Sequence, residues 1–147
     1  MICLIQRVKS GKVLLDNKIY SQINRGYVIL TGFCQDDDEN VVSTMAEKIA
    51  NLRIMPDENG KMNFNLSQVK GEILLVSQFT LCADTSQRRP SFIKALEPKK
   101  AEKLYHLLTK KLEEKNLMVK TGQFGSYMIV EILNDGPVTI ILDSKDF

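Results

Sequence analysis

The amino-acid sequence predicts an α+β domain with an antiparallel or mixed sheet, and three observations support this prediction. Strand-like segments lie at both ends of the chain, and two segments with helical periodicity are inserted between them. The 147 residues are 44% hydrophobic and 26% charged, which is typical of a globular protein large enough to bury a core without disulfides. No repeat, low-complexity tract or linker divides the chain, so residues 1–147 are expected to form one domain.

The first two strands are expected on either side of Gly11, in "ICLIQRV" and "KVLLDNKIYSQI", with a reversal at Asp16-Asn17. "GYVILTGF" is an almost continuous apolar run bounded by glycines, which predicts a buried strand. Further strands are expected in "GEILLVSQFTL", "LMVKTG", "SYMIVEIL" and "VTIILD".

Two helices are expected. The first follows Asp36, Asp37 and Asp38, because acidic residues at a helix start accept hydrogen bonds from free N–H groups and suit the helix dipole. "IMPDENGKMN" then breaks this helix and is expected to form a loop. The second helix begins near Pro98, a residue tolerated in the first helical turn. Residues on the predicted apolar faces are Val41, Met45, Ile49 and Leu52, and then Ala101, Leu104, Tyr105, Leu108 and Leu112.

The chain lacks the usual catalytic groups. His106 is the only histidine, and it is expected to lie exposed on the second helix, so no second histidine completes a metal site or serves as a base. No Gly-x-Ser-x-Gly elbow, P-loop or Gly-x-Gly-x-x-Gly motif is present. The acidic run 36–39 is interpreted as a helix cap rather than a metal site. An enzyme with this sequence is expected to use neither a metal nor a cofactor.

The cysteines and the net charge indicate in which compartment and with which kinds of partner the protein is expected to act. Cys3, Cys34 and Cys82 are odd in number, far apart and without a Cys-x-x-Cys pair, so neither a disulfide framework nor a zinc site is expected. This fits a reducing cytoplasm. No apolar run approaches the ~20 residues of a membrane helix, and the N-terminus lacks a secretion signal, so no membrane partner is expected. A net charge of +2 permits an anionic partner without requiring one.

Three short stretches remain, and each has an ordinary structural interpretation. "SQFTL", residues 77–81, is expected to continue a strand, with Ser77 and Phe79 facing one way and Gln78 and Thr80 the other. "FGSYM", residues 124–128, is typical of core packing. In "ILNDGPVTI", residues 134–137 form either a hairpin turn or a stiff backbone corner that contacts a ligand, since a Gly-Pro bond also accommodates a cis peptide.

Taken together, these stretches resemble the D-aminoacyl-tRNA deacylase family over essentially the whole chain. "IQRV" stands at the start, "SQFTL" in the middle and "TGQFGSYMIVEILNDGPVT" near the end, and the Ser-Gln-Phe-Thr and Asn-x-Gly-Pro-Val-Thr signatures are both intact. One loop departs from the family pattern. "DTSQRRPSF" carries Ser86, Gln87 and Arg88 where the family typically has a Lys-Gly pair, although residues 89–92 match. Arg88, Arg89 and lysines of the second helix are weaker candidates for contacts with tRNA phosphates.

The resemblance implies a small β-barrel-like sheet with two main helices packed outside, in a homodimer. It implies hydrolysis of the ester bond of D-aminoacyl-tRNA, as chirality proofreading in the cytoplasm. The partners implied are a second copy of the chain and the 3′-terminal adenosine of a tRNA that carries a D-amino acid. Gly136 and Pro137 match a cis pair that reaches into the active site of the other subunit and rejects L-residues sterically. Glycyl-tRNA is expected to be a further substrate, because glycine has no side chain to reject.

The same resemblance suggests roles for the catalytic signature. Thr80 matches a position proposed as a nucleophile or a water-orienting group, and the Phe79-Thr80 backbone is the candidate oxyanion donor. Ser77 and Gln78 complete the signature, with Gln78 lining the pocket. No general base lies nearby in the sequence, so water positioning assisted by the 2′-hydroxyl of the ribose is favoured over a covalent acyl-threonine.

Further residues are candidates for substrate binding. Phe124 and Met128 match positions that hold the terminal adenine, and Arg7 matches one that helps to fix the Gly-Pro segment. Two alternatives remain open. One is a non-catalytic nucleic-acid-binding protein on the same scaffold, and the other is a deacylase for a different mischarged tRNA, with a trans Gly-Pro bond.

Overall fold

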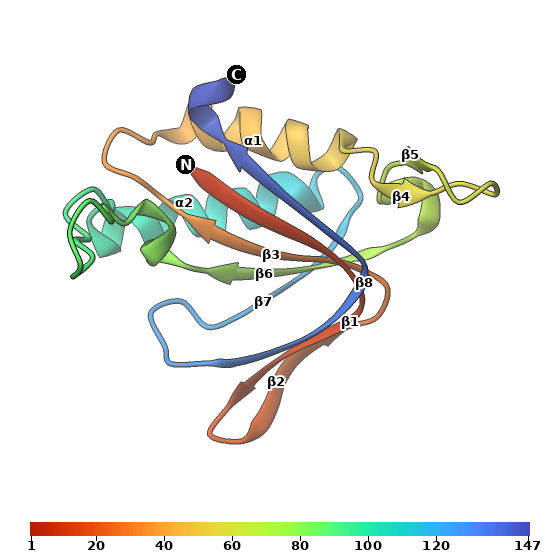
Figure 1. Ribbon diagram of the computed structural model, residues 1–147, viewed down its shortest axis with the longest axis horizontal. Helices are drawn as coiled ribbons and strands as arrows, with labels where there is room; N and C mark the ends of the chain where they lie inside the picture. The colour runs from red at the N-terminus through yellow and green to blue at the C-terminus, as the bar shows by residue number, and fades with distance from the viewer.

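The fold is built on a curved, mixed six-stranded sheet, and both long helices lie on one of its faces (Figure 1). The computed structural model describes residues 1–147. The main sheet consists of β1 (Ile2–Leu15), β2 (Lys18–Ile23), β3 (Gly26–Gly32), β6 (Glu72–Ser77), β7 (Met118–Thr121) and β8 (Ile129–Asp143). The remaining elements are β4 (Met55–Pro56), β5 (Met62–Phe64), α1 (Glu39–Asn51), α2 (Pro98–Glu113) and the 3-10 helices η1 (Ser67–Val69), η2 (Phe79–Cys82) and η3 (Ser144–Asp146).

The sheet is nearly closed on itself. Its order is β2-β1-β3-β6-β7, with β8 paired to β1. Strand β1 is antiparallel to β2, β3 and β8, while β6 runs parallel to both β3 and β7. Strand β2 curves back toward β7, where the Ser21 hydroxyl donates to the main-chain oxygen of Thr121 at 2.8 Å. This arrangement confirms the expected barrel-like mixed sheet with two helices outside.

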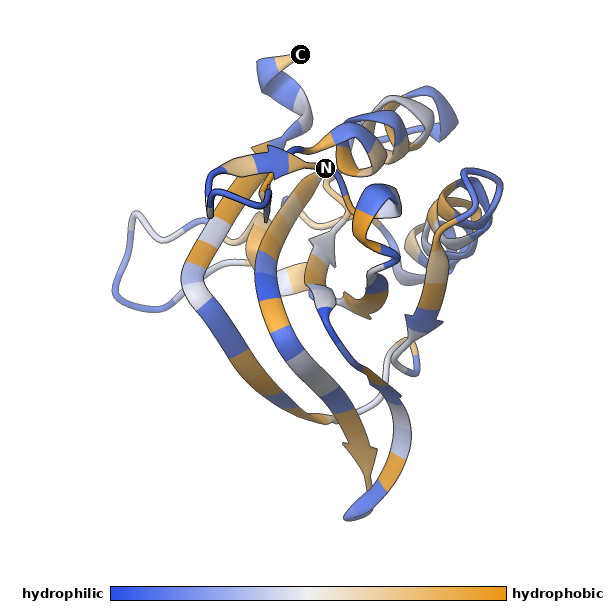
Figure 2. Cartoon of the chain, turned by 90° about the vertical axis from the view of Figure 1, so that its right-hand side faces the viewer, coloured by the Kyte–Doolittle hydropathy of each residue, from blue (hydrophilic) through white to orange (hydrophobic).

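Two apolar cores lie on opposite faces of the sheet. The larger core packs both helices against strand residues that include Tyr27 and Ile29, and the smaller one fills the inside of the curled sheet around Val28 and Leu74. Successive residues of β3 therefore alternate between two buried faces, which confirms the buried strand predicted there. Hydrophobic and hydrophilic segments both occur along the strands of the curled sheet and on the helices beside it (Figure 2).

Both helices form where they were predicted. The Asp38 carboxylate caps α1 by accepting the N–H of Val41 at 2.9 Å, and the Glu97 carboxylate caps α2. Helix α2 buries the five predicted apolar residues, and His106 is exposed as expected. Helix α1 buries Val42, Met45, Ala46 and Ile49, while the predicted Val41 and Leu52 pack at the edge of the same core. Neither helix is long and apolar enough to cross a membrane.

The expected break at Gly11 is wrong, because β1 continues through it. A Cβ atom at this position would lie 2.6 Å from Cγ2 of Val28, so the missing side chain permits close packing against β3 rather than a turn. The reversal at Asp16-Asn17 is confirmed, and both residues have positive φ angles, 48° and 61°. The segment "IMPDENGKMN", expected to be a loop, contains the hairpin of β4 and β5.

Candidate active site

The signature segment after β6 is a 3-10 turn rather than the predicted strand. The ladder between β3 and β6 ends at the pair Thr31 and Ser77, after which the Gln78 N–H donates to the Thr31 oxygen at 2.7 Å. The chain then turns into η2 directly over Gly32, where a Cβ atom would lie 2.8 Å from the Gln78 oxygen. The predicted alternation of residues 77–81 is therefore wrong, because alternation requires a ladder that has already ended.

The turn groups the predicted catalytic residues. Gln78 Nε2 donates to the Thr80 hydroxyl at 2.6 Å, and Ser77, Gln78 and Thr80 are all partly exposed. The first bond of the turn runs from the Leu81 N–H to the Gln78 oxygen at 3.2 Å, so the N–H groups of Phe79 and Thr80 precede the bonded part of η2. The arrangement therefore combines an oriented hydroxyl with adjacent main-chain donors.

The Phe79 side chain is 57% exposed, and its ring lies edge-on to that of Phe92 with centroids 5.1 Å apart. Phe92 ends the loop that departs from the family pattern. Main-chain hydrogen bonds between Asp84 and Ser91 close this loop at 2.8 and 2.9 Å, and Arg88 lies exposed at its tip. The altered loop thus contacts the η2 turn through this aromatic pair.

The Gly-Pro segment is a bulge inside one continuous strand. β8 runs without interruption from Ile129 to Asp143, although two separate strands were expected. Its pairing with β1 shifts between Gln6 and Val8, so residues 135–138 lie opposite Arg7 alone. The Gly136–Pro137 bond is cis. The segment is therefore neither a hairpin turn nor a loop.

Arg7 anchors this bulge. Its Nε donates to the Asp135 oxygen at 3.0 Å and its Nη1 donates to the Ile54 oxygen at 2.8 Å. The guanidinium also lies 3.6 Å from the Asp135 carboxylate, and its side chain is only 11% exposed. Gly136 and Pro137 themselves are exposed. A rigid, partly buried side chain thus holds an exposed backbone corner.

The predicted adenine-binding residues lie between β7 and β8. The Phe124 ring is partly exposed and packs against the Tyr105 ring with centroids 5.6 Å apart, while Met128 packs against the smaller core. The Tyr105 hydroxyl donates to the Leu75 oxygen at 2.7 Å, and burial raises its pKa. Tyr105 was predicted as a core residue, but its support of Phe124 was missed, because only the fold brings α2 beneath this loop.

One chain does not bring all of these residues together. Arg7 pairs with Tyr27, and Tyr27 pairs with Ile73, so the bulge lies level with the start of β6. From Ile73, β6 continues for about 13 Å to Ser77 at ~3.3 Å per residue, and Thr80 follows beyond that end. The η2 turn and the Gly-Pro corner therefore lie at different ends of the same sheet.

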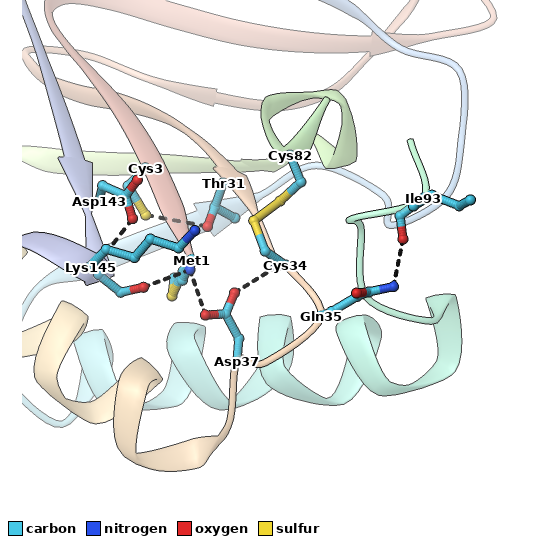
Figure 3. The surroundings of a disulfide bond; sticks show 11 residues. Met1, Cys3, Thr31, Cys34, Gln35, Asp37, Cys82, Ile93, Asp143 and Lys145 are labelled. Carbon is cyan, nitrogen blue, oxygen red and sulfur yellow. Dashed lines mark hydrogen bonds and ion pairs between the residues drawn. A yellow bond between two sulfur atoms is a disulfide. The ribbon is translucent and has the colours of Figure 1, made fainter. Parts of the chain in front are cut away.

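The structure contains a disulfide between Cys34 and Cys82, so the expectation of no disulfide is wrong (Figure 3). The two residues are 48 positions apart in sequence, but each one follows a strand of the parallel β3–β6 pair, and parallel strands end at the same edge of a sheet. Their Cα atoms lie 5.7 Å apart. The remaining Cys3 is buried, which raises the pKa of its thiol to about 12.

The sequence and the fold are similar to those of known deacylases. The profile described as D-Tyr-tRNA(Tyr) deacylase matches residues 4–143. D-aminoacyl-tRNA deacylases from Thermoanaerobacter sp. (strain X514) and Bacillus pumilus (strain SAFR-032) are both 49% identical to this chain, cover 99% of it, and are themselves covered over 98% and 100% of their length.

Two solved structures share the fold. The c-Myc DNA unwinding element binding protein superposes with a TM-score of 0.92 at 37% identity, covering 97% of this chain and 98% of its own. A probable eukaryotic D-amino acid tRNA deacylase superposes with a TM-score of 0.83 at 15% identity, covering 96% and 97% of the two chains. At that identity, the second likeness concerns the fold alone.

Proposed function

The chain belongs to the D-Tyr-tRNA(Tyr) deacylase family, and we propose that it hydrolyses the ester bond of D-aminoacyl-tRNA to release the free D-amino acid and the tRNA. The observation that carries this proposal is the family match, which spans every predicted site residue from Arg7 to Pro137. The reaction serves chirality proofreading in translation. It needs a site that stabilises an oxyanion and a site that recognises the α-carbon.

The turn formed by η2 supplies the site that stabilises the oxyanion. Attack of water on the ester carbonyl creates an oxyanion, which fixed main-chain N–H groups stabilise best, and the N–H groups of Phe79 and Thr80 are the donors. Gln78 Nε2 bonds to a lone pair of the Thr80 hydroxyl, which leaves its proton free to orient water or substrate. Ser77 lies next to this turn, as the last residue of β6.

Thr80 acts here without forming a covalent intermediate. A hydroxyl nucleophile needs an adjacent base, and the single histidine lies exposed on α2. The hydroxyl therefore positions the attacking water, and the vicinal 2′-hydroxyl of the substrate ribose assists the transfer.

A second copy of the chain supplies the part of the site that distinguishes D- from L-residues, which we call the chiral filter. In one chain the exposed Gly136–Pro137 corner lies far from Thr80, so a site that uses both requires a homodimer in which the corner enters the partner's catalytic cleft. Main-chain carbonyls of the corner accept hydrogen bonds from the substrate ammonium group. A D-side chain then leaves toward solvent, whereas an L-side chain meets backbone. Glycyl-tRNA escapes this rejection and is hydrolysed as well.

The terminal adenosine binds at Phe124 and Met128. Phe124 is partly exposed and its ring packs against that of Tyr105, so its exposed part is available for stacking on an unpaired base. Stacking of this kind tolerates any amino acid on the ribose, because it contacts only the tRNA end. It therefore fits an enzyme with a broad choice of D-residues.

The experiment is incubation of the protein with D-Tyr-tRNA without added metal or nucleotide. Release of D-tyrosine at catalytic enzyme concentrations is expected. The competing function is nucleic-acid binding without catalysis, which the name of the 37% identical c-Myc DNA unwinding element binding protein favours. Stable binding of the charged tRNA with no release of D-tyrosine would replace the hydrolase by that alternative.

A further inference from the structure

A disulfide closes the C-terminal end of the catalytic turn, because Cys82 is the last residue of η2 (Figure 3). We propose that Cys34 and Cys82 form a thiol–disulfide exchange site that determines how firmly η2 is held and thereby sets the catalytic rate. The kinetic part of this inference rests on the deacylase function proposed above. Its structural part does not.

The two ends of η2 are held differently. At the entry, the Gln78 N–H bonds to the Thr31 oxygen of the neighbouring strand. At the exit, the hydrogen bonds are local: the Ala83 N–H bonds to the Thr80 oxygen within the turn, and Asp84 bonds within its own loop. Beyond residue 84 the loop is exposed up to residue 94. The disulfide is therefore the covalent tie that links the exit of η2 to the sheet.

The partner of Cys82 lies in a well-anchored segment. The Cys34 N–H donates to the Asp37 carboxylate at 2.6 Å, and the Gln35 N–H donates to the Lys94 oxygen at 2.9 Å. The Leu96 N–H donates to the main-chain oxygen of Phe33 at 2.9 Å. A covalent bond to this hydrogen-bonded segment therefore restrains the turn.

The different exposure of the two cysteines determines the order of the exchange steps. Cys34 is partly exposed, whereas Cys82 is only 4% exposed. The Cys34 thiolate attacks a low-molecular-weight disulfide such as glutathione disulfide, forms a mixed disulfide and releases one thiol. The Cys82 thiolate then attacks the Cys34 sulfur, closes the protein disulfide and releases the second thiol. The two protein thiols lose two electrons and two protons in total, and the external disulfide gains them.

The catalytic consequence follows from the position of the donors. The Phe79 and Thr80 N–H groups point at the reacting carbonyl only while η2 keeps its geometry, and a misplacement of ~1 Å can cost about 100-fold in rate. We expect the reduced enzyme to have a kcat about tenfold lower than the oxidised enzyme. Proofreading thus becomes faster as the thiol pool becomes more oxidised.

The test compares the protein equilibrated with excess glutathione disulfide and with excess glutathione. After denaturation, thiol titration is expected to find one free thiol in the oxidised chain, from Cys3, and three in the reduced chain. Amide hydrogen exchange in residues 79–83 is expected to be slower in the oxidised form, and D-Tyr-tRNA deacylation faster. Cys34→Ser removes both differences, and Cys3→Ala, which leaves the pair intact, preserves them.

Three free thiols in excess glutathione disulfide would overturn the proposal. So would a disulfide that forms but leaves both the amide exchange of η2 and kcat unchanged. If neither form hydrolyses the tRNA ester, the proposed function fails, but the thiol count and the exchange rates still decide whether the pair restrains η2. Cys34 is the residue of choice for substitution because it is the more exposed of the two, and its replacement disturbs packing less.

Discussion

Arg7 Nε donates a hydrogen bond to the main-chain oxygen of Asp135 at 3.0 Å, so a side chain of β1 holds the residue that precedes Gly136 and Pro137. The same guanidinium bonds to the Ile54 oxygen. It thus ties the Gly-Pro corner to the segment after α1. In the proposed dimer, the precision of the chiral filter depends on this tie.

Replacing Arg7 by lysine should therefore weaken both the fold and the discrimination. An ammonium group cannot make the two divergent bonds of the guanidinium, and a lost hydrogen bond to a charged donor costs about 1.5–3 kcal/mol of unfolding free energy. Urea unfolding and the ratio of kcat/KM for D- and L-Tyr-tRNA measure the two effects. Lys12→Met is the control on the same strand, since Lys12 makes only an exposed pair with Glu131. Unchanged discrimination in Arg7→Lys would contradict the anchoring role.

Gly136→Ala should reduce activity through the backbone. Gly136 has a φ of 133°, and a Cβ atom there would lie 2.9 Å from Cγ2 of Val138 and 3.2 Å from Nη2 of Arg7. The strain costs about 1–3 kcal/mol. We expect at least a tenfold fall in kcat/KM for D-Tyr-tRNA. Gly60→Ala is the matched control, because Gly60 also has a positive φ, 76°, but no atom lies within 4 Å of the added Cβ. Equal losses of activity in the two variants would show that the corner has no special role.

Thr80→Ala distinguishes water positioning from covalent catalysis. Loss of a true nucleophile reduces kcat by roughly 10⁶-fold, whereas loss of one positioning hydroxyl is expected to cost about 10- to 100-fold. Thr80→Ser keeps the hydroxyl that accepts the Gln78 hydrogen bond and should retain most of the rate. Single-turnover deacylation of D-Tyr-tRNA gives the comparison. Complete inactivity of Thr80→Ala with tRNA binding unchanged would favour the covalent route.

Much of the fold could be predicted from local patterns. The spacing of the apolar residues in α2 and the continuous apolar run of β3 depend only on which sides of each element are buried. Both elements could therefore be predicted from short stretches of sequence, and the structure confirms both. The end of β6 could not be predicted in this way. "SQFTL" continues a favourable strand pattern, but its partner strand β3 ends at Gly32, and a strand without a partner loses its ladder.

The disulfide was missed for a related reason. Sequence separation says nothing about the distance between Cys34 and Cys82 until the parallel pairing of β3 and β6 is known. The candidate site residues were chosen from motifs, and their roles stay predictions, while the structure shows on which elements they lie. Their division between two ends of one chain is visible only in three dimensions, because it depends on the register between β1 and β8.

Reduction of the disulfide should lower the stability of the whole chain. Closing a loop with a sequence separation of 48 residues removes conformational entropy from the unfolded chain, and the chain-entropy model assigns this about 4 kcal/mol of unfolding free energy. Denaturant unfolding with and without a reductant measures the difference. Cys34→Ser should unfold at the same midpoint in both conditions. If the reductant still lowered the unfolding midpoint of Cys34→Ser, the disulfide would not be the source of the effect.

The central claim is that this chain hydrolyses D-aminoacyl esters of tRNA and rejects their L-counterparts. The most direct measurement is deacylation of matched D-Tyr-tRNA and L-Tyr-tRNA at the same low enzyme concentration, with no metal and no nucleotide added. We expect rapid loss of the D-ester while the L-ester decays at the rate seen without enzyme. Equal loss of the two esters would contradict the chiral filter, and loss of neither would contradict the hydrolase itself.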